Sequence, residues 1–188
     1  MTRTEQKERR RLQILMTGLD LFVSKGYHAT KTSDISKLAG ISEGLLFHYF
    51  PTKHDLYMEL VKMGSQETDL FPDVIENPYD ILYNAINHFL TKIESNRVIA
   101  KMFALMNQAQ NKEGTPEEIY KLACTVSTIT DTIKIIELGQ NQGVFREGDP
   151  LNLSYTFWNA FDGNMLELAK NPAMEIPKAE WLMGILIK

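Results

Sequence analysis

Residues 31–50 read KTSDISKLAGISEGLLFHYF, and their apolar spacing predicts two short helices joined by a tight turn at Gly40. The first helix is expected to carry Ile35, Leu38 and Ala39 on its inner face. The second is expected to turn Leu46 inward, together with the Phe50 that follows it. A short helix that presents small, polar and aromatic residues, braced by another helix, fits the major groove of DNA. The outward residues of this second helix are Glu43, Gly44, Leu45, Phe47, His48 and Tyr49.

Charge is unevenly distributed along the 188 residues. Residues 1–60 carry nine Lys or Arg and seven Asp or Glu, whereas residues 61–188 carry eleven and seventeen. Five basic and two acidic side chains fall within residues 1–11 alone. The formal net charge of −4 therefore hides a positive end, and that end carries the two-helix stretch. This division is expected of a DNA-reading head joined to a body that does not touch DNA.

The composition is that of a globular protein, with 44% hydrophobic residues and a single cysteine. Cys124 cannot form an internal disulfide, which favours the cytoplasm, and its apolar neighbours predict that it packs in the core. The apolar residues after Arg9-Arg10-Arg11 form one helical stripe that Gln13 and Asp20 interrupt. We therefore expect neither a secretory signal nor a membrane span.

Start and stop signals predict about nine helices and no strand. A change of character between roughly 62 and 77 places the domain junction there, which gives a DNA-binding domain over 1–61 and a second domain over 62–188. The first four expected helices run over roughly 4–25 with a stop near Gly26, from after Thr32, from after Ser42, and from Thr52 through Val61. The next three run from Pro78 through Ile93, over 96–110, and from Thr115 to about Gln142 with a stop at Gly143. The last two run over 150–170 and from Pro177 through Leu186.

Residues 10–60 resemble the N-terminal domain of the tetracycline-repressor (TetR, or AcrR) family of bacterial transcription regulators. Beyond residue 60 the chain resembles the family only in the number and order of its helices. The residues that carry the resemblance are Leu21, Phe22, Gly26, Tyr27, Thr32, Ile35, Ala39, Gly40, Ile41, Ser42, Gly44, Leu46, Phe50, Lys53 and Leu56.

The resemblance implies an all-α homodimer. Each subunit would have a homeodomain-like helix-turn-helix head of three helices and a C-terminal helical body for ligand binding and dimerisation. Two heads would read a palindromic operator in double-stranded DNA, and a small apolar or amphipathic effector in the body would release it. Two residues depart from the family pattern, because Phe47 stands where tyrosine is frequent and Ser36 where alanine is usual. Phe47 has no hydroxyl to offer a phosphate and can make only apolar contacts, such as one with a thymine methyl group.

The candidate DNA contacts divide into phosphate contacts and base contacts. Lys53, Tyr49 and Thr32 are expected at phosphates. The residues expected to face base edges are His48, Phe47, Leu45 and Glu43. The full predicted set is Thr32, Ser33, Ser42, Glu43, Gly44, Leu45, Phe47, His48, Tyr49 and Lys53.

Several of these residues also have purely structural interpretations. Thr32 and Ser42 are residue types that cap helices, and Lys53 is also a common type of solvated surface residue. Glu43 can accept from a cytosine amino group or simply be favoured at a helix N-terminus. The arginines at 9–11 reach flanking phosphates or a minor groove in one interpretation and form a solvated helix end in the other.

The second domain offers aromatic and polar residues as candidate ligand contacts. Aromatic residues and methionines at helical spacing are usually core, whereas buried polar residues need partners. Pairing of the 150–170 and C-terminal helices with a second copy would complete a four-helix interface. The predicted ligand set is Phe103, Met106, Tyr120, Trp158, Asn159 and Asp162.

Other functional classes fit less well. We find no spacing typical of metal ligands, no nucleophile–base set and no phosphate-cradling loop, so we expect no enzyme, cofactor or metal. A TetR-like protein controlled by a protein partner remains an alternative, and a filled core in the body would favour it. A purely structural helical dimer would not need the basic N-terminal segment.

Overall fold

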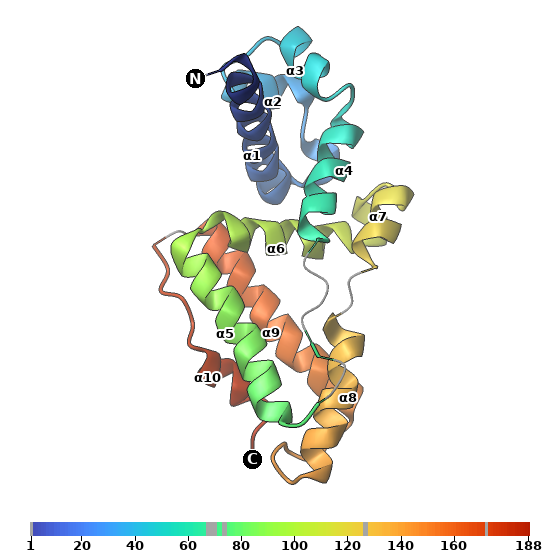
Figure 1. Ribbon diagram of the computed structural model, residues 1–188. Coiled ribbons are helices and arrows are strands. Elements are labelled where there is room, and N and C mark those ends of the chain that lie inside the picture. The colour runs from blue at the N-terminus through green and yellow to red at the C-terminus, as the bar shows by residue number, and fades with distance from the viewer. Residues whose placement is uncertain (1, 67–70, 73–74, 126–127, 172) are drawn as a thin grey trace. The chain divides into compact units, whose positions relative to one another are not determined.

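The computed structural model describes residues 2–66, 71–72, 75–125, 128–171 and 173–188 (Figure 1). The described chain is helical, as expected, apart from an isolated bridge between Phe145 and Ile187. Parts of the expected junction at 62–77 lie outside the described residues. The helices are α1 (Arg3–Ala29), α2 (Thr32–Leu38), α3 (Glu43–Tyr49), α4 (Lys53–Gly64), α5 (Pro78–Ser95), α6 (Val98–Ala109), the 3-10 helix η1 (Lys112–Gly114), α7 (Glu117–Ala123), α8 (Thr128–Asn141), α9 (Pro150–Lys170) and α10 (Ala179–Met183).

The chain forms two compact units, which are described separately. Unit 1 is Met1–Gln66 with Ala104–Thr125, and unit 2 is Glu67–Phe103 with Val126–Lys188. The domains expected over 1–61 and 62–188 stay a prediction, but residues 104–125 pack with the N-terminal helices. Gln108 Nε2, for example, donates to the carbonyl oxygen of Val23 at 2.9 Å. No helix in the described ranges is both long and apolar enough to cross a bilayer.

Unit 1 is built around α1, which packs against α2 and α4, while α7 packs against α4. A close approach of α1 and α4 depends on Gly18, where a Cβ atom would lie 2.6 Å from Leu56 Cδ2. The expected stop at Gly26 is a kink with φ of +79°, after which helical residues continue to Ala29. The core of these helices comprises Ile14, Leu15, Leu19, Phe22, Ile35, Leu46, Phe50, Leu56, Tyr57, Leu60 and Val61.

The single helix expected from Thr115 to about Gln142 is wrong, because the structure has two helices there. α7 ends at Ala123, and the Thr125 hydroxyl turns back to donate to the Leu122 carbonyl at 2.8 Å. β-Branched and hydroxylated residues favour helix interiors poorly, and six of them follow Cys124 without interruption in sequence. The expected cap is also wrong, since Thr115 is buried and donates to the Gln108 carbonyl at 3.2 Å.

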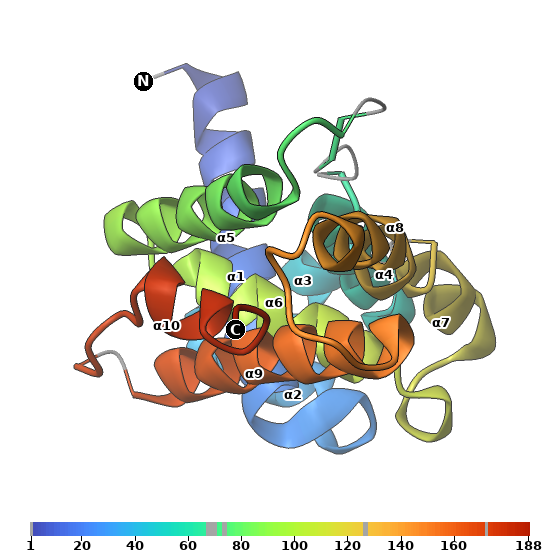
Figure 2. The same cartoon turned by 90° about the horizontal axis from the view of Figure 1, so that it is seen from below.

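Unit 2 packs α8 along α9 and places α10 between α5 and α9 (Figure 2). The C-terminal helix is shorter than expected, because α10 ends at Met183. The segment after it is held by Arg146, whose backbone N–H donates to the Leu186 carbonyl at 2.8 Å. The guanidinium of the same residue donates to the Gly184 and Ile187 carbonyls at 3.0 and 2.8 Å. The chain after α10 therefore continues as turns that end in a single bridge between Ile187 and Phe145.

Gly139 on α8 is expected to tolerate no side chain. A Cβ atom there would overlap the buried ring of Phe145, so Gly139→Ala should lower the free energy of unfolding by about 1–3 kcal/mol. Gly163→Ala on α9 is the matched control, because its Cβ would meet open space and should stabilise the helix by up to about 1 kcal/mol. Urea unfolding followed by circular dichroism compares the two, and equal stabilities would contradict the packing.

Candidate nucleic-acid interface

The α2–α3 pair forms the expected two-helix turn. Gly40 has φ of +65°, a conformation that favours glycine. The Ser42 hydroxyl accepts a hydrogen bond from the Leu45 N–H at 3.2 Å, which caps α3 as predicted. Leu46 and the Phe50 that follows α3 are buried. These contacts hold α3 against the unit by one side only.

The other side of α3 is open to solvent, as predicted. Phe47 is 42% exposed and Leu45 is 37% exposed, which is high for apolar side chains. Tyr49 is partly buried, and its ring meets that of His48 edge to face with centroids 5.5 Å apart. The exposed residues of this surface, which we call the α3 face, are Glu43, Gly44, Leu45, Phe47 and His48.

Two expectations for α2 are wrong. Lys31, not Thr32, is the N-cap residue, and no side chain caps this helix; Thr32 is its first residue. Leu38 is 63% exposed, because the inner face consists of Ile35, Ser36 and Ala39. Ser36 can be buried there since its hydroxyl donates to the Ser33 carbonyl at 3.1 Å. Thr32 is partly exposed and Ser33 is exposed, so both remain candidate phosphate contacts.

Lys53 is engaged within unit 1. Its Nζ donates to the carbonyl oxygens of Tyr27 at 2.8 Å and Thr30 at 2.9 Å, and it lies 4.3 Å from the centroid of the Tyr27 ring. Burial lowers the pKa of Lys53 below its ordinary value. The ammonium thus links the start of α4 to the segment after the Gly26 kink, a role that its sequence position does not predict.

The aromatic cluster beneath Lys53 is closely packed. Tyr27 and Tyr57 approach to 5.0 Å between centroids, and Phe22 meets Tyr57 at 4.7 Å. Burial raises the pKa of Tyr57 to about 12 and also raises the pKa of Tyr27. Both phenols therefore stay neutral at physiological pH and act as packing groups.

Two of the three arginines at 9–11 make side-chain contacts within unit 1. Arg11 forms an ion pair with Glu59 at 2.6 Å and lies over the Phe50 ring. Arg10 Nη1 donates to Gln13 Oε1 at 2.9 Å, and Gln13 Nε2 donates to the Ala39 carbonyl at 3.0 Å. The contact between Gln13 and Ala39 was not predicted from the sequence. Only the contact between Arg10 and Gln13 had a sequence signal, because the two residues are three positions apart on one helix.

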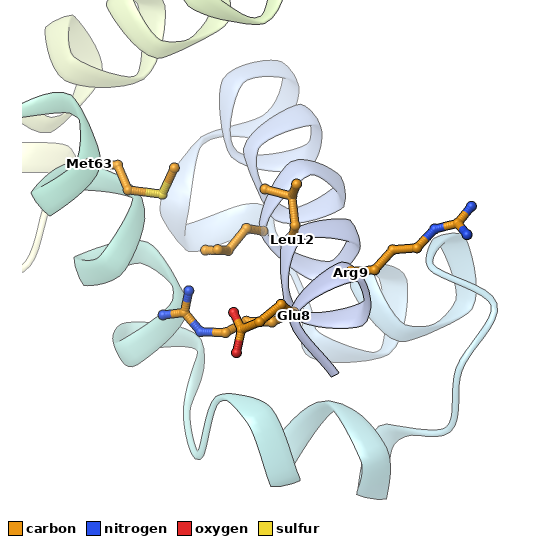
Figure 3. A pocket seen from close by; sticks show the side chains of 6 residues that line it. Glu8, Arg9, Leu12 and Met63 are labelled. Atoms are coloured by element: carbon orange, nitrogen blue, oxygen red, sulfur yellow. The ribbon is translucent and has the colours of Figure 1, made fainter. Parts of the chain in front are cut away.

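A hollow of about 370 Å³ lies between α1 and α4. Met63 and Leu12 approach it from the two helices, whereas the guanidinium of Arg9 points away from α4 (Figure 3). Its lining residues are Glu8, Arg9, Arg11, Leu12, Leu15 and Met63, none of which belongs to the predicted ligand set.

The predicted ligand residues divide between the two units. In unit 2, Trp158 is only 3% exposed, and its Nε1 donates to Thr132 Oγ1 at 2.9 Å. Its ring meets Phe161, which in turn meets Phe103 with centroids 5.1 Å apart. The neighbouring Asn159 is exposed.

The remaining predicted ligand residues are only partly buried. Asp162 lies one helical turn beyond Trp158 on α9, and Met106 and Tyr120 belong to unit 1. A hydrogen bond with Cys124 raises the pKa of Tyr120. Cys124 itself is exposed, so its expected place in the core is wrong; it follows the last buried turn of α7. The six residues therefore do not all belong to one compact unit.

Comparisons with known proteins match the same part of the chain. Residues 14–60 match the family model of bacterial regulatory proteins of the tetR family. The transcriptional regulator QacR of Staphylococcus aureus is 39% identical over 51 residues, which cover 27% of each chain. The uncharacterized regulator YuxN of Bacillus subtilis is 30% identical over 117 residues, 62% of this chain and 40% of that protein. The chain thus aligns with less than half the length of either relative.

The fold extends the likeness to nearly the whole chain. The MbdR regulator from Azoarcus sp. CIB superposes with a TM-score of 0.76 over 94% of this chain and 97% of that one, at 24% identity. The N-terminal match gives the family, and the superposition gives a common helical architecture. Residues 14–60 therefore form a DNA-binding segment of the TetR family type, and the rest of the chain shares a helical architecture with MbdR.

Proposed function

We propose that this protein is a transcriptional regulator that binds a palindromic operator as a homodimer and is released by a small effector. The match of residues 14–60 to the tetR family model supports the DNA-binding role, since the relatives named above are helix-turn-helix transcriptional regulators. The exposed α3 face is the observation that carries the proposal. It holds two large apolar residues and one imidazole at the surface of a helix anchored only by its opposite side. Such a regulator would act in the cytoplasm, beside the chromosome.

Phosphates and bases would be read by different residues. Thr32, Tyr49 and Lys53 would fix the register on the backbone, while Phe47 and His48 would face base edges. Ser33, Ser42, Glu43, Gly44 and Leu45 complete the proposed contact surface. Two copies of α3 should enter successive major grooves roughly 34–36 Å apart.

A homodimer is supported by exposed apolar residues on two helices of unit 2. Leu151 and Tyr155 on α9 are exposed, and Trp181 on α10 is 60% exposed. Isolated large apolar side chains are ordinary, but several on elements that could pair with a second copy favour association. Sedimentation equilibrium should give twice the 21.5 kDa chain mass, and a monomer at micromolar concentration would contradict the dimer.

DNA binding itself is tested by selection of duplexes from a random pool, followed by anisotropy titrations at several salt concentrations. If the dimer neutralises about six phosphates, the log–log slope of affinity against salt should be near −5. Enrichment of a palindrome with a steep slope is the expected result. A protein that enriches no duplex, or whose binding ignores salt, is not the proposed regulator.

His48→Ala should change which sequences are bound. The imidazole is exposed on the α3 face, where it would contact a base edge, so its loss should reduce discrimination at one position of each half-site by about 1–3 kcal/mol. Repeating the selection with the variant measures this change. Lys62→Ala, at an exposed position in the last turn of α4, should leave the selected sequence unaltered. If the His48→Ala variant selects the same DNA sequence as the wild type, His48 does not contact a base.

Effector release is proposed from the family and from the aromatic content of unit 2. The effector must favour the state that cannot bind DNA, because equal affinity for both states shifts nothing. The predicted contacts are Phe103, Trp158, Asn159 and Asp162 from unit 2 and Met106 and Tyr120 from unit 1. Screening small amphipathic compounds for loss of operator binding tests this proposal.

The packing of aromatic rings in unit 2 favours a second candidate, control by a protein partner. Phe89, Phe103, Phe161 and Trp158 contact one another in one cluster, as expected of a filled core. A compound that binds the protein and releases the operator would support the effector proposal. Release only by a co-purified protein would support the partner.

A further inference from the structure

We infer that Arg10 is a DNA-phosphate contact that Gln13 positions beside the α2–α3 turn. The inference rests on the proposed function and adds to it a contact on α1, outside the two-helix stretch. It begins from the hydrogen-bond series Arg10 Nη1 to Gln13 Oε1 at 2.9 Å and Gln13 Nε2 to the Ala39 carbonyl at 3.0 Å. We call this series the Arg10–Gln13 link.

The link places a cation next to the start of α3. Ala39 is separated from the N-cap residue Ser42 by only two residues, Gly40 and Ile41. Figure 1 shows the N-terminal end of α1 at the same end of unit 1 as α3. Because Gln13 uses its amide oxygen toward Arg10 and its amide nitrogen toward the turn, it holds the two elements in register.

Phosphate recognition needs such a cation because the α3 face supplies little positive charge. The α3 sequence contains Glu43 and His48 but no lysine or arginine. Several cations of unit 1 are engaged elsewhere, since Arg11 pairs with Glu59 and Lys25 pairs with Asp34 at 3.0 Å. Affinity for DNA depends largely on phosphate neutralisation, so basic side chains next to α3 gain importance.

Arg10 has the chemistry that this position requires. A guanidinium presents five N–H donors in a planar fork, and the bond from Nη1 to Gln13 uses one of them. The other donors suit the oxygens of a phosphate group. The residue is also partly buried although the helix around it is mostly exposed, so part of its conformational freedom is already lost before binding.

Anisotropy titrations with the duplex selected by the wild-type protein test the inference. Arg10→Ala should weaken binding about tenfold or more and reduce the magnitude of the salt slope by about 2, one phosphate for each subunit. A scrambled duplex should lose affinity by a similar factor, because a phosphate contact carries no sequence information. Arg10→Lys should keep the slope, since the charge remains.

Gln13 is tested through its dependence on Arg10. Gln13→Ala should weaken binding severalfold in the wild-type background and much less in the Arg10→Ala background, because a positioning residue acts only through the group that it positions. Equal losses in both backgrounds would mean that Gln13 only braces the turn, and would overturn its positioning role. Thermal melts confirm that each variant is folded.

Lys62→Ala is the matched control, because it removes one positive charge from unit 1 at the far end of α4 (Figure 1) and should leave the slope unchanged. A wild-type salt slope for Arg10→Ala would overturn the inference while leaving the proposed function intact. A wild-type protein that binds no duplex would instead overturn the proposed function.

Discussion

Replacement of Trp158 by alanine is expected to lower the free energy of unfolding by about 3–5 kcal/mol. The indole is almost completely buried, and its ring meets Phe157 and Phe161 with centroids 5.4 and 5.7 Å apart. Its N–H is bonded to the hydroxyl of Thr132, which is itself fully buried and donates to the Thr128 carbonyl. Truncation would remove the ring contacts and leave a cavity, and it would also leave Thr132 one partner short.

The adjacent residue provides the control. Asn159 is exposed on the same helix, so Asn159→Ala should change the stability by no more than about 0.5 kcal/mol. Trp158→Phe separates the two contributions at the buried site, because it keeps a ring and removes the N–H donor. The free energy of unfolding of Trp158→Phe should fall by about 1–3 kcal/mol, because a buried polar group loses its partner and the ring is smaller.

Urea unfolding of the ligand-free protein measures these differences. Trp181→Phe should be made first, since the chain has two tryptophans and Trp181 is 60% exposed. The fluorescence of the remaining Trp158 should then resist quenching by acrylamide. Strong quenching, or a Trp158→Ala protein as stable as the wild type, would mean that the indole faces an open pocket, and the effector site would gain its central residue.

Local signals explain why much of the fold was predictable. Ser42 caps α3, Thr52 and Asp55 form the capping box of α4, and Asn77 and Asp149 cap the two helices that begin at prolines. Each of these signals lies within four residues of the backbone group that it satisfies. The outward position of Phe47 followed from the same short-range periodicity.

Contacts between distant segments were not predictable in this way. Lys53 meets Tyr27 across 26 residues, and Gln13 meets Ala39 across the same separation. Leu38 was expected to be buried because periodicity alone cannot tell which of two neighbouring helix faces meets the core. In the structure Ser36 lies on the buried face and Leu38 does not. The break near Cys124 was missed because an amphipathic pattern continues through it, although helix propensity falls there.

Lys53→Ala is expected to reduce both folding stability and DNA affinity. The ammonium makes two short hydrogen bonds to the Tyr27 and Thr30 carbonyls and lies over the Tyr27 ring. Hydrogen bonds from a charged donor contribute about 1.5–3 kcal/mol each, and they are not additive when one group makes both. The free energy of unfolding of the variant should therefore fall by about 2–4 kcal/mol. The upper end of this range includes the loss of the cation–π contact.

Lys53→Met distinguishes the charge from the side-chain stem. Methionine keeps an apolar chain of similar length to pack against Tyr27 but has no donor for the two carbonyls. Its stability should therefore be close to that of Lys53→Ala, and both should fall below Lys62→Ala, whose side chain is exposed. A Lys53→Met protein as stable as the wild type would mean that packing of the stem, and not the hydrogen bonds, joins α4 to the segment after the Gly26 kink.

The phosphate contact predicted for Lys53 survives only if one donor remains for DNA. An ammonium has three donors; two make the short bonds, and the third lies 3.5 Å from the His28 carbonyl, a weak contact. A phosphate oxygen could replace that carbonyl without breaking the shorter bonds. Loss of Lys53 should then weaken binding to all duplexes alike and reduce the salt slope by about 2 for a dimer. Reduced stability with an unchanged slope would leave Lys53 as a structural link alone, and the backbone register would then depend on Thr32, Tyr49 and Arg10.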